Sequence, residues 1–354
     1  SLARLGDAAI SPDGRLAVVT VTRYDVAENK GFSDLWLVPV AGGAARQLTS
    51  DKASDTNPAW SPDGQSIAFL SKRGDDKENQ LYVIAVDGGE ARRITHVPTG
   101  VNAPKWFPDG RQLAFVSPVW NDLVKWEDQE KRLKEREESK MTAKVWDRAP
   151  IAYWDHLLDD REPHLYSVSV DGGEPQAITR QSGYFLSKQE YSTASYDIAP
   201  DGLEVAFAAN TDRVGNDPNY DVIVLPTCGC KAPRNVTTDN TADDIAPLYS
   251  PDGRWLAFTR QKIKGFYGDR ARLMLLDRKG GSLRDLSLDW DRSADGLSWL
   301  PDSSALLGTI DDAGTNRVWR FELARPGQPR ALVAAHRDRR AALWPLQRAG
   351  DQQR

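Results

Sequence analysis

The chain has 354 residues, of which 40% are hydrophobic, and a formal net charge of −5. This acidic balance argues against a nucleic-acid-binding or anionic-membrane surface, because such a surface needs a basic face. No run of 18 apolar residues occurs, so no membrane span is expected, and no export signal is visible. The length suits one large repeat domain.

One turn motif, Ser-Pro-Asp-Gly or a near copy of it, recurs six times along the chain. Pro presets φ at the second position, Asp accepts local backbone hydrogen bonds, and Gly closes the bend in the left-handed conformation. The copies start 50, 46, 92, 51 and 50 residues apart, and a repeat of this size is typical of an array of like units. They begin at Ser11, Ser61, Phe107, Ala199, Ser250 and Leu300.

Strand-like sequence flanks each turn. In the second repeat, residues 57–60, 66–71, 80–86 and 90–95 read as four short strands, with a hairpin at Asp87-Gly88-Gly89. A second marker in phase with the turn is a β-rich stretch that ends in a hydroxyl residue. Four antiparallel strands in about 40–50 residues predict a WD-like β-propeller blade. The closing hydroxyl residues are Thr49, Thr95, Thr179, Thr237 and Ser287.

The 92-residue gap holds an insertion rather than a hidden blade. Residues 113–117 are expected to be the second strand of the third blade and residues 164–170 its third strand, with no turn motif between them. About 45 residues are therefore inserted into one blade loop.

The predicted fold is all-β: a β-propeller with six recognisable four-stranded blades, the start of a seventh, and a helical insertion in the third blade. Residues 120–163 form the inserted helix and an aromatic loop. The expected blades span about 1–50, 51–96, 97–180, 181–238, 239–288 and 289–336, with a partial blade at 337–354.

The insertion begins with a charged helix over residues 121–144. Glu127/Lys131, Glu130/Lys134 and Lys134/Glu138 are spaced i, i+4 and support the helix, whereas its apolar stripe is sparse. We expect the helix to stand out from the propeller, either as a solvated decoration or as a contact arm for a second domain or subunit. A homo-oligomer through this helix is one form of the second alternative.

An aromatic and charged loop follows the helix. Trp146, Tyr153 and Trp154 lie among several charges there. Loops on rigid scaffolds often carry recognition, although the same aromatics could simply seat the inserted segment on its blade.

The two cysteines, Cys228 and Cys230, occupy a hairpin position where other blades carry Gly-Gly. They could form a small redox pair or half of a metal site. However, a bridge across one residue is geometrically unfavourable, and further metal ligands are lacking nearby. A drifted turn is the preferred interpretation.

Known catalytic and cofactor motifs are missing. The sequence has no Gly-x-Ser-x-Gly elbow, Walker loop, dinucleotide fingerprint or His-Glu-x-x-His motif. Asp155 beside His156 is not a triad, because adjacent strand residues point to opposite faces. No catalytic residue, cofactor or metal is therefore assigned to this chain.

Two strings resemble one family. Residues 22–30 followed by 33–39 resemble the first blade of bacterial prolyl-oligopeptidase-family serine peptidases, in the dipeptidyl-peptidase and acylaminoacyl-peptidase branch. Residues 154–160 followed by 163–166 are similar to that branch too. The resemblance covers nearly the whole chain, although the repeat turns are shared with TolB-like and tricorn-like propellers.

The resemblance implies a role as part of a serine exopeptidase or oligopeptidase. Family members pair an N-terminal propeller with a C-terminal α/β-hydrolase domain, which is missing here, so the implied partners are that domain or fragment and short peptides. In dipeptidyl-peptidase IV relatives paired glutamates hold the substrate's amino group, but the adjacent pair here, Glu137-Glu138, lacks matching flanks. A carboxylate near Asp155 to Asp160 is preferred as the amine anchor on charge complementarity. The candidate substrate-binding residues are Trp154, Asp155, Asp159 and Asp160.

Three functions therefore compete. The preferred one is a non-catalytic propeller that gates and helps bind short peptides for a periplasmic or secreted serine peptidase, with a cytoplasmic location left open. The main alternative is a TolB-like protein-interaction propeller without an enzymatic role, and a further rival is a stand-alone sugar- or peptide-binding propeller.

Overall fold

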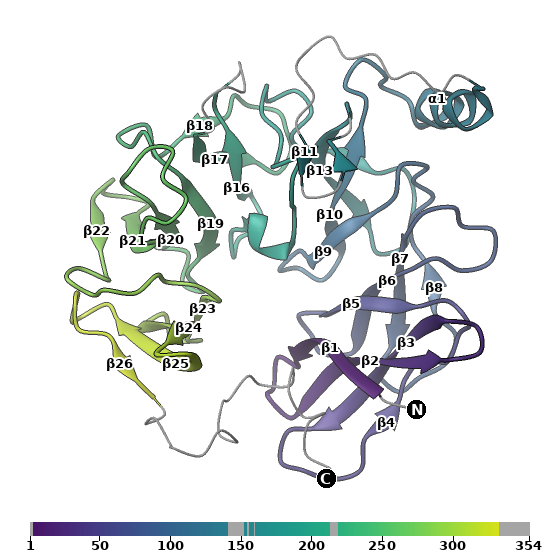
Figure 1. The fold of residues 1–354 in the computed structure, drawn as a ribbon, viewed down its shortest axis with the longest axis horizontal. Helices are drawn as coiled ribbons and strands as arrows, with labels where there is room; N and C mark the ends of the chain where they lie inside the picture. Colours follow the sequence, from purple (N-terminus) through teal and green to yellow (C-terminus); the bar gives the residue numbers. More distant parts are fainter. Residues whose placement is uncertain (1–2, 141–151, 154–155, 159, 213–218, 333–354) are drawn as a thin grey trace. The chain divides into compact units, whose positions relative to one another are not determined.

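The computed structural model describes residues 3–140, 152–153, 156–158, 160–212 and 219–332. The chain divides into two compact units, residues 1–192 and residues 193–348. In each unit, three four-stranded antiparallel sheets follow one another in chain order (Figure 1). The six four-stranded sheets of the described residues make the fold a six-bladed β-propeller, as predicted. The expected start of a seventh blade, residues 337–354, lies outside the described residues.

The first unit holds three blades built from strands β1 to β10, β13 and β14. Blade 1 consists of β1 (Ala3–Ile10), β2 (Leu16–Asp25), β3 (Lys30–Pro39) and β4 (Arg46–Gln47). Blade 2 consists of β5 (Asp55–Trp60), β6 (Ser66–Ser71), β7 (Gln80–Ala85) and β8 (Arg92–Arg93). Blade 3 consists of β9 (Asn102–Trp106), β10 (Gln112–Val119), β13 (Glu162–Ser169) and β14 (Gln176–Ala177).

The second unit holds the other three blades and a short 3-10 helix, η1 (Thr193–Ser195), at its start. Blade 4 consists of β15 (Tyr196–Ile198), β16 (Glu204–Asn210), β17 (Tyr220–Pro226) and β18 (Arg234–Asn235). Blade 5 consists of β19 (Asp244–Tyr249), β20 (Trp255–Arg260), β21 (Arg272–Asp277) and β22 (Leu283–Asp285). Blade 6 consists of β23 (Ser298–Trp299), β24 (Ala305–Asp312), β25 (Thr315–Glu322) and β26 (Arg330–Ala331).

The long gap between turn motifs is an insertion, as predicted. Strands β10 and β13 pair without interruption from Gln112↔Ser169 to Val119↔Glu162, so they are neighbours in one sheet although the insertion separates them in sequence. The insertion contains one helix, α1 (Trp126–Glu138), and a two-stranded hairpin of β11 (Ala152–Tyr153) and β12 (His156–Leu157). Among the described residues, no helix combines the length and apolar character needed to cross a bilayer.

The recurrent turn forms through hydrogen bonds within the motif itself. In the second copy, the amide of Gly64 donates to the carbonyl of Ser61 at 2.9 Å, and Gly64 has a φ of 70°. The Ser61 hydroxyl donates to Asp63 at 2.5 Å and accepts the amide of Ser66 at 2.9 Å. These bonds satisfy the polar groups of the turn locally, which explains why the same four residues recur.

The hydroxyl residue that closes each repeat also has a defined role. Its oxygen accepts the amide of an inner residue of the third strand, which the fourth strand, only two or three residues long, leaves without a ladder partner. The five bonds of this kind measure 2.9–3.0 Å: Thr49 from Leu35, Thr95 from Leu81, Thr179 from Leu165, Thr237 from Val222 and Ser287 from Leu273.

Neighbouring blades within each unit bury their apolar faces against each other. Blades 2 and 3 share one cluster that includes Leu70, Leu81 and Phe115, and blades 5 and 6 share another. In three of the four neighbouring pairs, blades 1 and 2, 2 and 3, and 5 and 6, a tryptophan at the end of the first strand adds a hydrogen bond. Its indole N–H donates to a backbone carbonyl in the first strand of the preceding blade: Trp60 to Ala9 at 2.9 Å, Trp106 to Ala59 at 3.0 Å and Trp299 to Leu248 at 3.2 Å.

Replacing Thr49 by Val tests the closing hydroxyl. Val has nearly the same shape, but the buried amide of Leu35 loses its 3.0 Å acceptor, so the free energy of unfolding should fall by about 1–3 kcal/mol. Denaturant titration followed by circular dichroism measures the loss. The neighbouring exposed Ser50 provides the control: Ser50→Ala should leave the unfolding midpoint unchanged. Equal midpoints for Thr49→Val and the wild type would contradict this role.

Replacing Ser61 by Ala tests the turn. The hydrogen bond from the Ser61 hydroxyl is the main cause that lowers the pKa of Asp63, so the variant should raise this pKa toward its ordinary value. A carboxyl whose pKa is lowered by folding adds stability above its unfolded pKa of about 3.9, and this stability is lost as the pH falls through the folded pKa. The wild type should therefore exceed the variant in stability at neutral pH, and the difference should shrink below about pH 4. A carbon-detected NMR titration of the Asp63 carboxyl, with Ser50→Ala as reference, gives the pKa directly.

Candidate functional site

The predicted substrate-binding residues lie in the insertion just before β13. Trp154, Asp155 and Asp159 fall outside the described residues, and the proposed role of the segment stays a prediction. Of the four candidates, Asp160 is described, and it is half exposed.

Asp160 joins the end of the insertion to α1. Arg136 of α1 donates to both carboxylate oxygens, Nη1 to Oδ1 at 3.0 Å and Nη2 to Oδ2 at 2.6 Å. The indole of Trp120 donates to Oδ2 at 2.9 Å, and the Arg136 guanidinium lies 4.6 Å from the centre of the Trp120 ring. The Arg136–Asp160 pair therefore ties the end of the insertion to α1. An amine that bound Asp160 would share its carboxylate with the Arg136 guanidinium.

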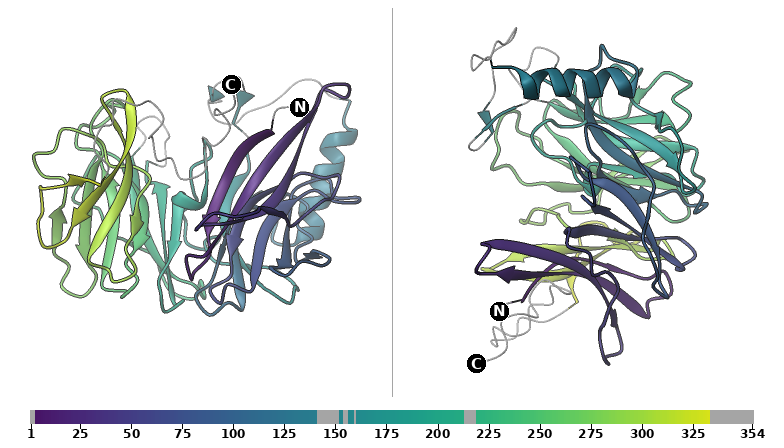
Figure 2. Two further views of the ribbon diagram at one scale, coloured as in Figure 1. Left: turned by 90° about the horizontal axis from the view of Figure 1, so that it is seen from below. Right: turned by 90° about the vertical axis from the view of Figure 1, so that its right-hand side faces the viewer.

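The helix α1 is held on blade 3 by a buried glutamine. The Gln129 side chain is 1% exposed, accepts the amide of Trp120 at 3.0 Å, and donates to the carbonyls of Trp120 and Leu123 at 2.8 and 2.7 Å. Trp126 packs on the core beside Tyr166, with the ring centres 5.0 Å apart. The helix is thus attached to blade 3 at Trp126 and Gln129, and most of its other residues are exposed (Figure 2). The expected solvated helix is present, and what it leans on is blade 3 itself.

The charged face of α1 forms as predicted in part. Glu130 and Lys134 pair across one turn at 2.7 Å, while a second i, i+4 pair joins Lys131 to Glu135 at 3.9 Å. The helix ends earlier than expected, because Ser139 is already in an extended conformation.

A cavity of about 440 Å³ lies between α1 and blade 2. The loop between β6 and β7 and the connection after β8 form one wall, and the helix forms the other. The apolar part of its lining is Val97, Pro98, Trp126 and Leu133. Lys77 reaches from the blade to Glu137 of the helix at 2.9 Å, so an ion pair spans the two walls.

The lining of this cavity is acidic. The side chain of Asp76 is fully buried and pairs with Arg93 at 2.7 Å, and it accepts the hydroxyl of Tyr82 at 2.8 Å. Burial, followed by this hydrogen bond, raises the pKa of Tyr82 to about 12, so Tyr82 remains a donor at neutral pH. Three more carboxylates face the cavity, and within the described chain no lysine or arginine pairs with them: Asp75, Glu78 and Glu127.

The arrangement favours an organic cation as ligand. An indole face and unpaired carboxylates both attract an ammonium or guanidinium group. The sequence analysis missed this cavity, because the loop at residues 72–79 carried no signal beyond its polarity. Within the described residues, no group of three metal-binding side chains comes together.

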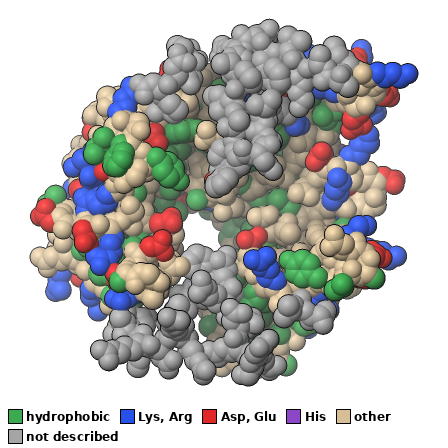
Figure 3. Space-filling model, in the orientation of Figure 1, with side chains coloured by type: hydrophobic (Ala, Val, Ile, Leu, Met, Phe, Trp, Pro, Cys, Tyr) green, Lys and Arg blue, Asp and Glu red, His purple; other side chains and the backbone are tan. Residues whose placement is uncertain are grey.

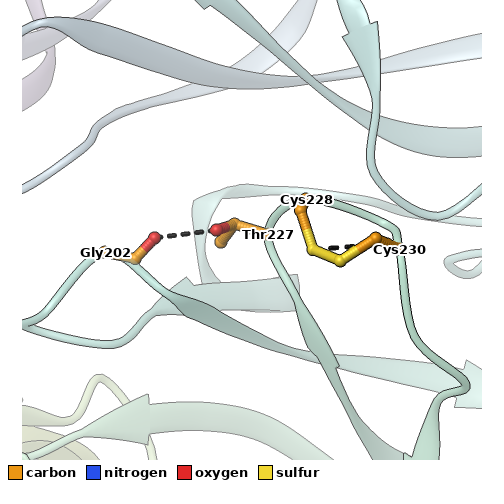
Figure 4. Close-up of a disulfide and its surroundings, with 4 residues drawn as sticks. All are labelled: Gly202, Thr227, Cys228 and Cys230. Atoms are coloured by element: carbon orange, nitrogen blue, oxygen red, sulfur yellow. Dashed lines mark hydrogen bonds between the residues drawn. A yellow bond between two sulfur atoms is a disulfide. The ribbon is translucent and has the colours of Figure 1, made fainter.

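The two cysteines sit in the hairpin between β17 and β18, as expected, but they form a disulfide (Figure 4). The expectation of an unbridged turn is therefore wrong. Gly229 has a φ of 59°, which folds the chain back and brings the two Cα atoms to 5.1 Å. That separation lies inside the usual disulfide range of about 4.4–6.8 Å.

Lysine and arginine side chains are interspersed with acidic ones on the described surface that Figure 3 shows. Neither sign of charge forms a continuous area on the part of this face that is described. The acidic lining of the cavity is therefore a local feature and does not follow from the overall net charge of −5.

Comparison with known proteins agrees with this fold. A family model described as the Tricorn protease N-terminal beta propeller domain matches residues 26–135. A dipeptidyl-peptidase 5 of Porphyromonas gingivalis is 27% identical over 349 residues, which are 96% of this chain and 49% of that protein. The resemblance predicted from the sequence is confirmed. A dipeptidyl-peptidase 5 of Trichophyton tonsurans is 24% identical over 95% of this chain and 49% of its own length.

Solved structures show the same fold at low identity. The acylaminoacyl peptidase of Pyrococcus horikoshii matches with a TM-score of 0.67 and 14% identity, over 94% of this chain and 46% of that one. The propeller domain of the Trilobed protease from Pyrococcus furiosus matches with a TM-score of 0.60 and 13% identity, over 94% and 84% of the two chains. The chain thus spans about half the length of the curated relatives that it matches over most of its own length.

Replacing Gln129 by Leu tests how α1 is held. The variant leaves the buried amide of Trp120 and the carbonyls of Trp120 and Leu123 without partners, at about 1–3 kcal/mol for each group that stays buried. Hydrogen exchange of the amides of α1 should become at least about tenfold faster. The control is Glu135→Gln on the exposed face, where the 3.9 Å pair with Lys131 contributes little. Unchanged protection in Gln129→Leu would show that other contacts hold the helix.

Proposed function

We propose that this propeller is the non-catalytic part of a serine peptidase, in which it binds short peptides and limits access to an α/β-hydrolase domain. The supporting observation is its similarity, over 96% of its own length, to about half of a dipeptidyl-peptidase 5. The catalytic serine, histidine and acid are proposed to lie in the other part of the enzyme. The reaction of the whole enzyme is then acyl transfer through that serine.

The propeller contributes orientation and exclusion. A blade scaffold that holds one end of a peptide converts a bimolecular encounter into an oriented one, which can supply several kcal/mol of the catalytic effect. It also keeps folded proteins and bulk water from the reacting bond.

The insertion of blade 3 supplies the proposed anchor for the peptide's amino end. The segment with Trp154, Asp155, Asp159 and Asp160 joins aromatic and acidic side chains, the combination that suits an ammonium group. The bidentate Arg136–Asp160 pair supports this placement, because it ties the segment to α1. The acidic cavity between α1 and blade 2 is the alternative position for the amine.

A TolB-like interaction role is not favoured. The TolB of Acinetobacter baumannii matches with a TM-score of 0.51 and 15% identity over 93% of this chain, and at this identity the likeness concerns the fold alone. The relatives that are similar in sequence over most of this chain carry peptidase names instead. Self-association through the exposed face of α1 stays a prediction.

We also propose a periplasmic or extracellular location. Disulfides persist mainly in oxidising compartments, and the bond between Cys228 and Cys230 supports such a compartment.

Calorimetric titration with short peptides tests the proposed function. A dipeptide amide with a free amino end should bind, and N-acetylation should weaken binding by about 10- to 100-fold, since a charge-assisted hydrogen bond is lost. The double variant Asp155→Asn with Asp159→Asn should bind the dipeptide with the free amino end more weakly by the same factor. Asp160 is left unchanged, because its substitution also breaks the pair with Arg136.

Two controls make the result specific. Glu174→Gln, an exposed carboxylate on the hairpin before β14, should bind the dipeptide as the wild type does. If Glu127→Gln weakens binding while the double variant does not, the amine lies in the cavity beside α1. No binding of either peptide would count against the proposed peptide-binding role.

A further inference from the structure

The disulfide of blade 4 closes an unusually small loop at an exposed hairpin. Cys228 and Cys230 are two positions apart, and both side chains are exposed. They are the two cysteines of the sequence, so no other thiol of the chain competes for either sulfur.

The hairpin is already held without this bond. Strands β17 and β18 pair at Ile223↔Asn235 and Val224↔Arg234. The amide of Gly229 donates to the carbonyl of Pro226 at 2.9 Å, and the amide of Thr227 donates to the carbonyl of Leu203 at 3.0 Å. The hydroxyl of Thr227 donates to the carbonyl of Gly202 at 2.8 Å, which fixes the turn to the neighbouring loop (Figure 4).

A structural purpose for the bond is therefore weak. A disulfide stabilises chiefly by constraining the unfolded chain, and the constraint is smallest for the shortest loops. The corresponding hairpins of blades 1, 2, 3 and 5 form without cysteines, at Gly42-Gly43, Gly88-Gly89, Gly172-Gly173 and Gly280-Gly281. Blade 4 thus carries a reactive group where the fold does not require one.

The surroundings of the two sulfurs differ. The amide N–H of Cys230 donates to the Sγ of Cys228 at 3.3 Å (Figure 4). A donor at this sulfur stabilises a thiolate there, and the reactivity of cysteine follows the stability of its thiolate. The sulfur of Cys228 is therefore the better leaving group, which directs an attacking thiol to the sulfur of Cys230.

We propose that Cys228 and Cys230 form a thiol–disulfide exchange site for small thiols of the glutathione class. An incoming thiolate bonds to the sulfur of Cys230, the protein's S–S bond breaks, and its electron pair passes to Cys228, which becomes the thiolate under the Cys230 amide. A second thiolate then attacks the sulfur of the bound thiol and releases Cys230 as a thiolate. Both protein thiolates take up a proton, so two small thiols are oxidised to one disulfide while the protein disulfide becomes a dithiol.

The exchange is tested on the folded chain in glutathione buffers of graded reduced-to-oxidised ratio, quenched with N-ethylmaleimide and read by intact mass. The oxidised protein should take up no label, and the reduced protein should take up two. We expect complete and reversible conversion, with an unchanged far-ultraviolet circular dichroism spectrum and a melting temperature within about 2 °C. A bond that stays closed until the protein unfolds, or a hairpin that unfolds when the bond opens, overturns the proposal.

The single variants test the direction of attack. Cys230→Ser keeps the backbone amide at position 230, so its remaining Cys228 thiol should ionise more readily than the Cys230 thiol of Cys228→Ser. The rate of alkylation by iodoacetamide at neutral pH should be at least about threefold higher for Cys230→Ser. Equal rates, or a faster reaction of Cys228→Ser, overturn the assignment of Cys228 as the leaving sulfur. The double variant with both cysteines replaced by Ser serves as the unlabelled control, and its melting temperature should match that of the wild type within about 2 °C.

Discussion

A four-stranded sheet with two apolar faces is stable only when both faces are covered, and this constraint explains most of the structure. Strands β6 and β20 are buried along almost their whole length, on both sides of the sheet. Blade 2 contributes to the clusters on either side of it, and blade 5 does the same in the second unit. The indole bonds from Trp60, Trp106 and Trp299 add a directional contact to this burial, which fixes how neighbouring first strands align.

The same constraint explains why a long insertion is tolerated. Strands β10 and β13 meet through a continuous ladder that ends at Val119↔Glu162, so the blade itself brings the two ends of the insertion together. The entropy of closing a loop grows slowly with its length, and the insertion therefore adds little cost to the blade. It is free to carry charge, and α1 places that charge opposite the polar loop of blade 2, where the acidic cavity forms. Binding residues often lie on loops that a rigid scaffold positions, and here the paired strands of blade 3 are that scaffold.

The hairpin of blade 4 follows a related logic. Backbone pairing and the Thr227 hydroxyl already define its shape, so the two cysteines are available for chemistry rather than for stability. The propeller thus keeps its recurrent hydrogen-bonding pattern inside the blades, and its two chemically distinctive features, the acidic cavity and the disulfide, lie on connections between strands.

The repeated turn and the closing hydroxyl determined the fold from the sequence alone, because both are local. The bonds of Ser61 and Asp63 stay within six residues, and Thr95 bonds a strand residue only 14 positions before it. Each copy of the two markers therefore predicts one blade. Even the insertion could be located, since it interrupts that period.

The site could not be predicted in the same way. The packing of Gln129 under α1, the meeting of Glu127 with Asp75 and Glu78, and the pairing of Arg136 with Asp160 join segments that no periodic pattern connects. The disulfide depended on the positive φ of Gly229, a backbone detail that the spacing of the cysteines does not contain. Short motifs encode hydrogen bonds between near neighbours, so the sequence alone determined the blades. Contacts between distant segments depend on how the blades and the inserted helix pack, so only the tertiary structure decided them.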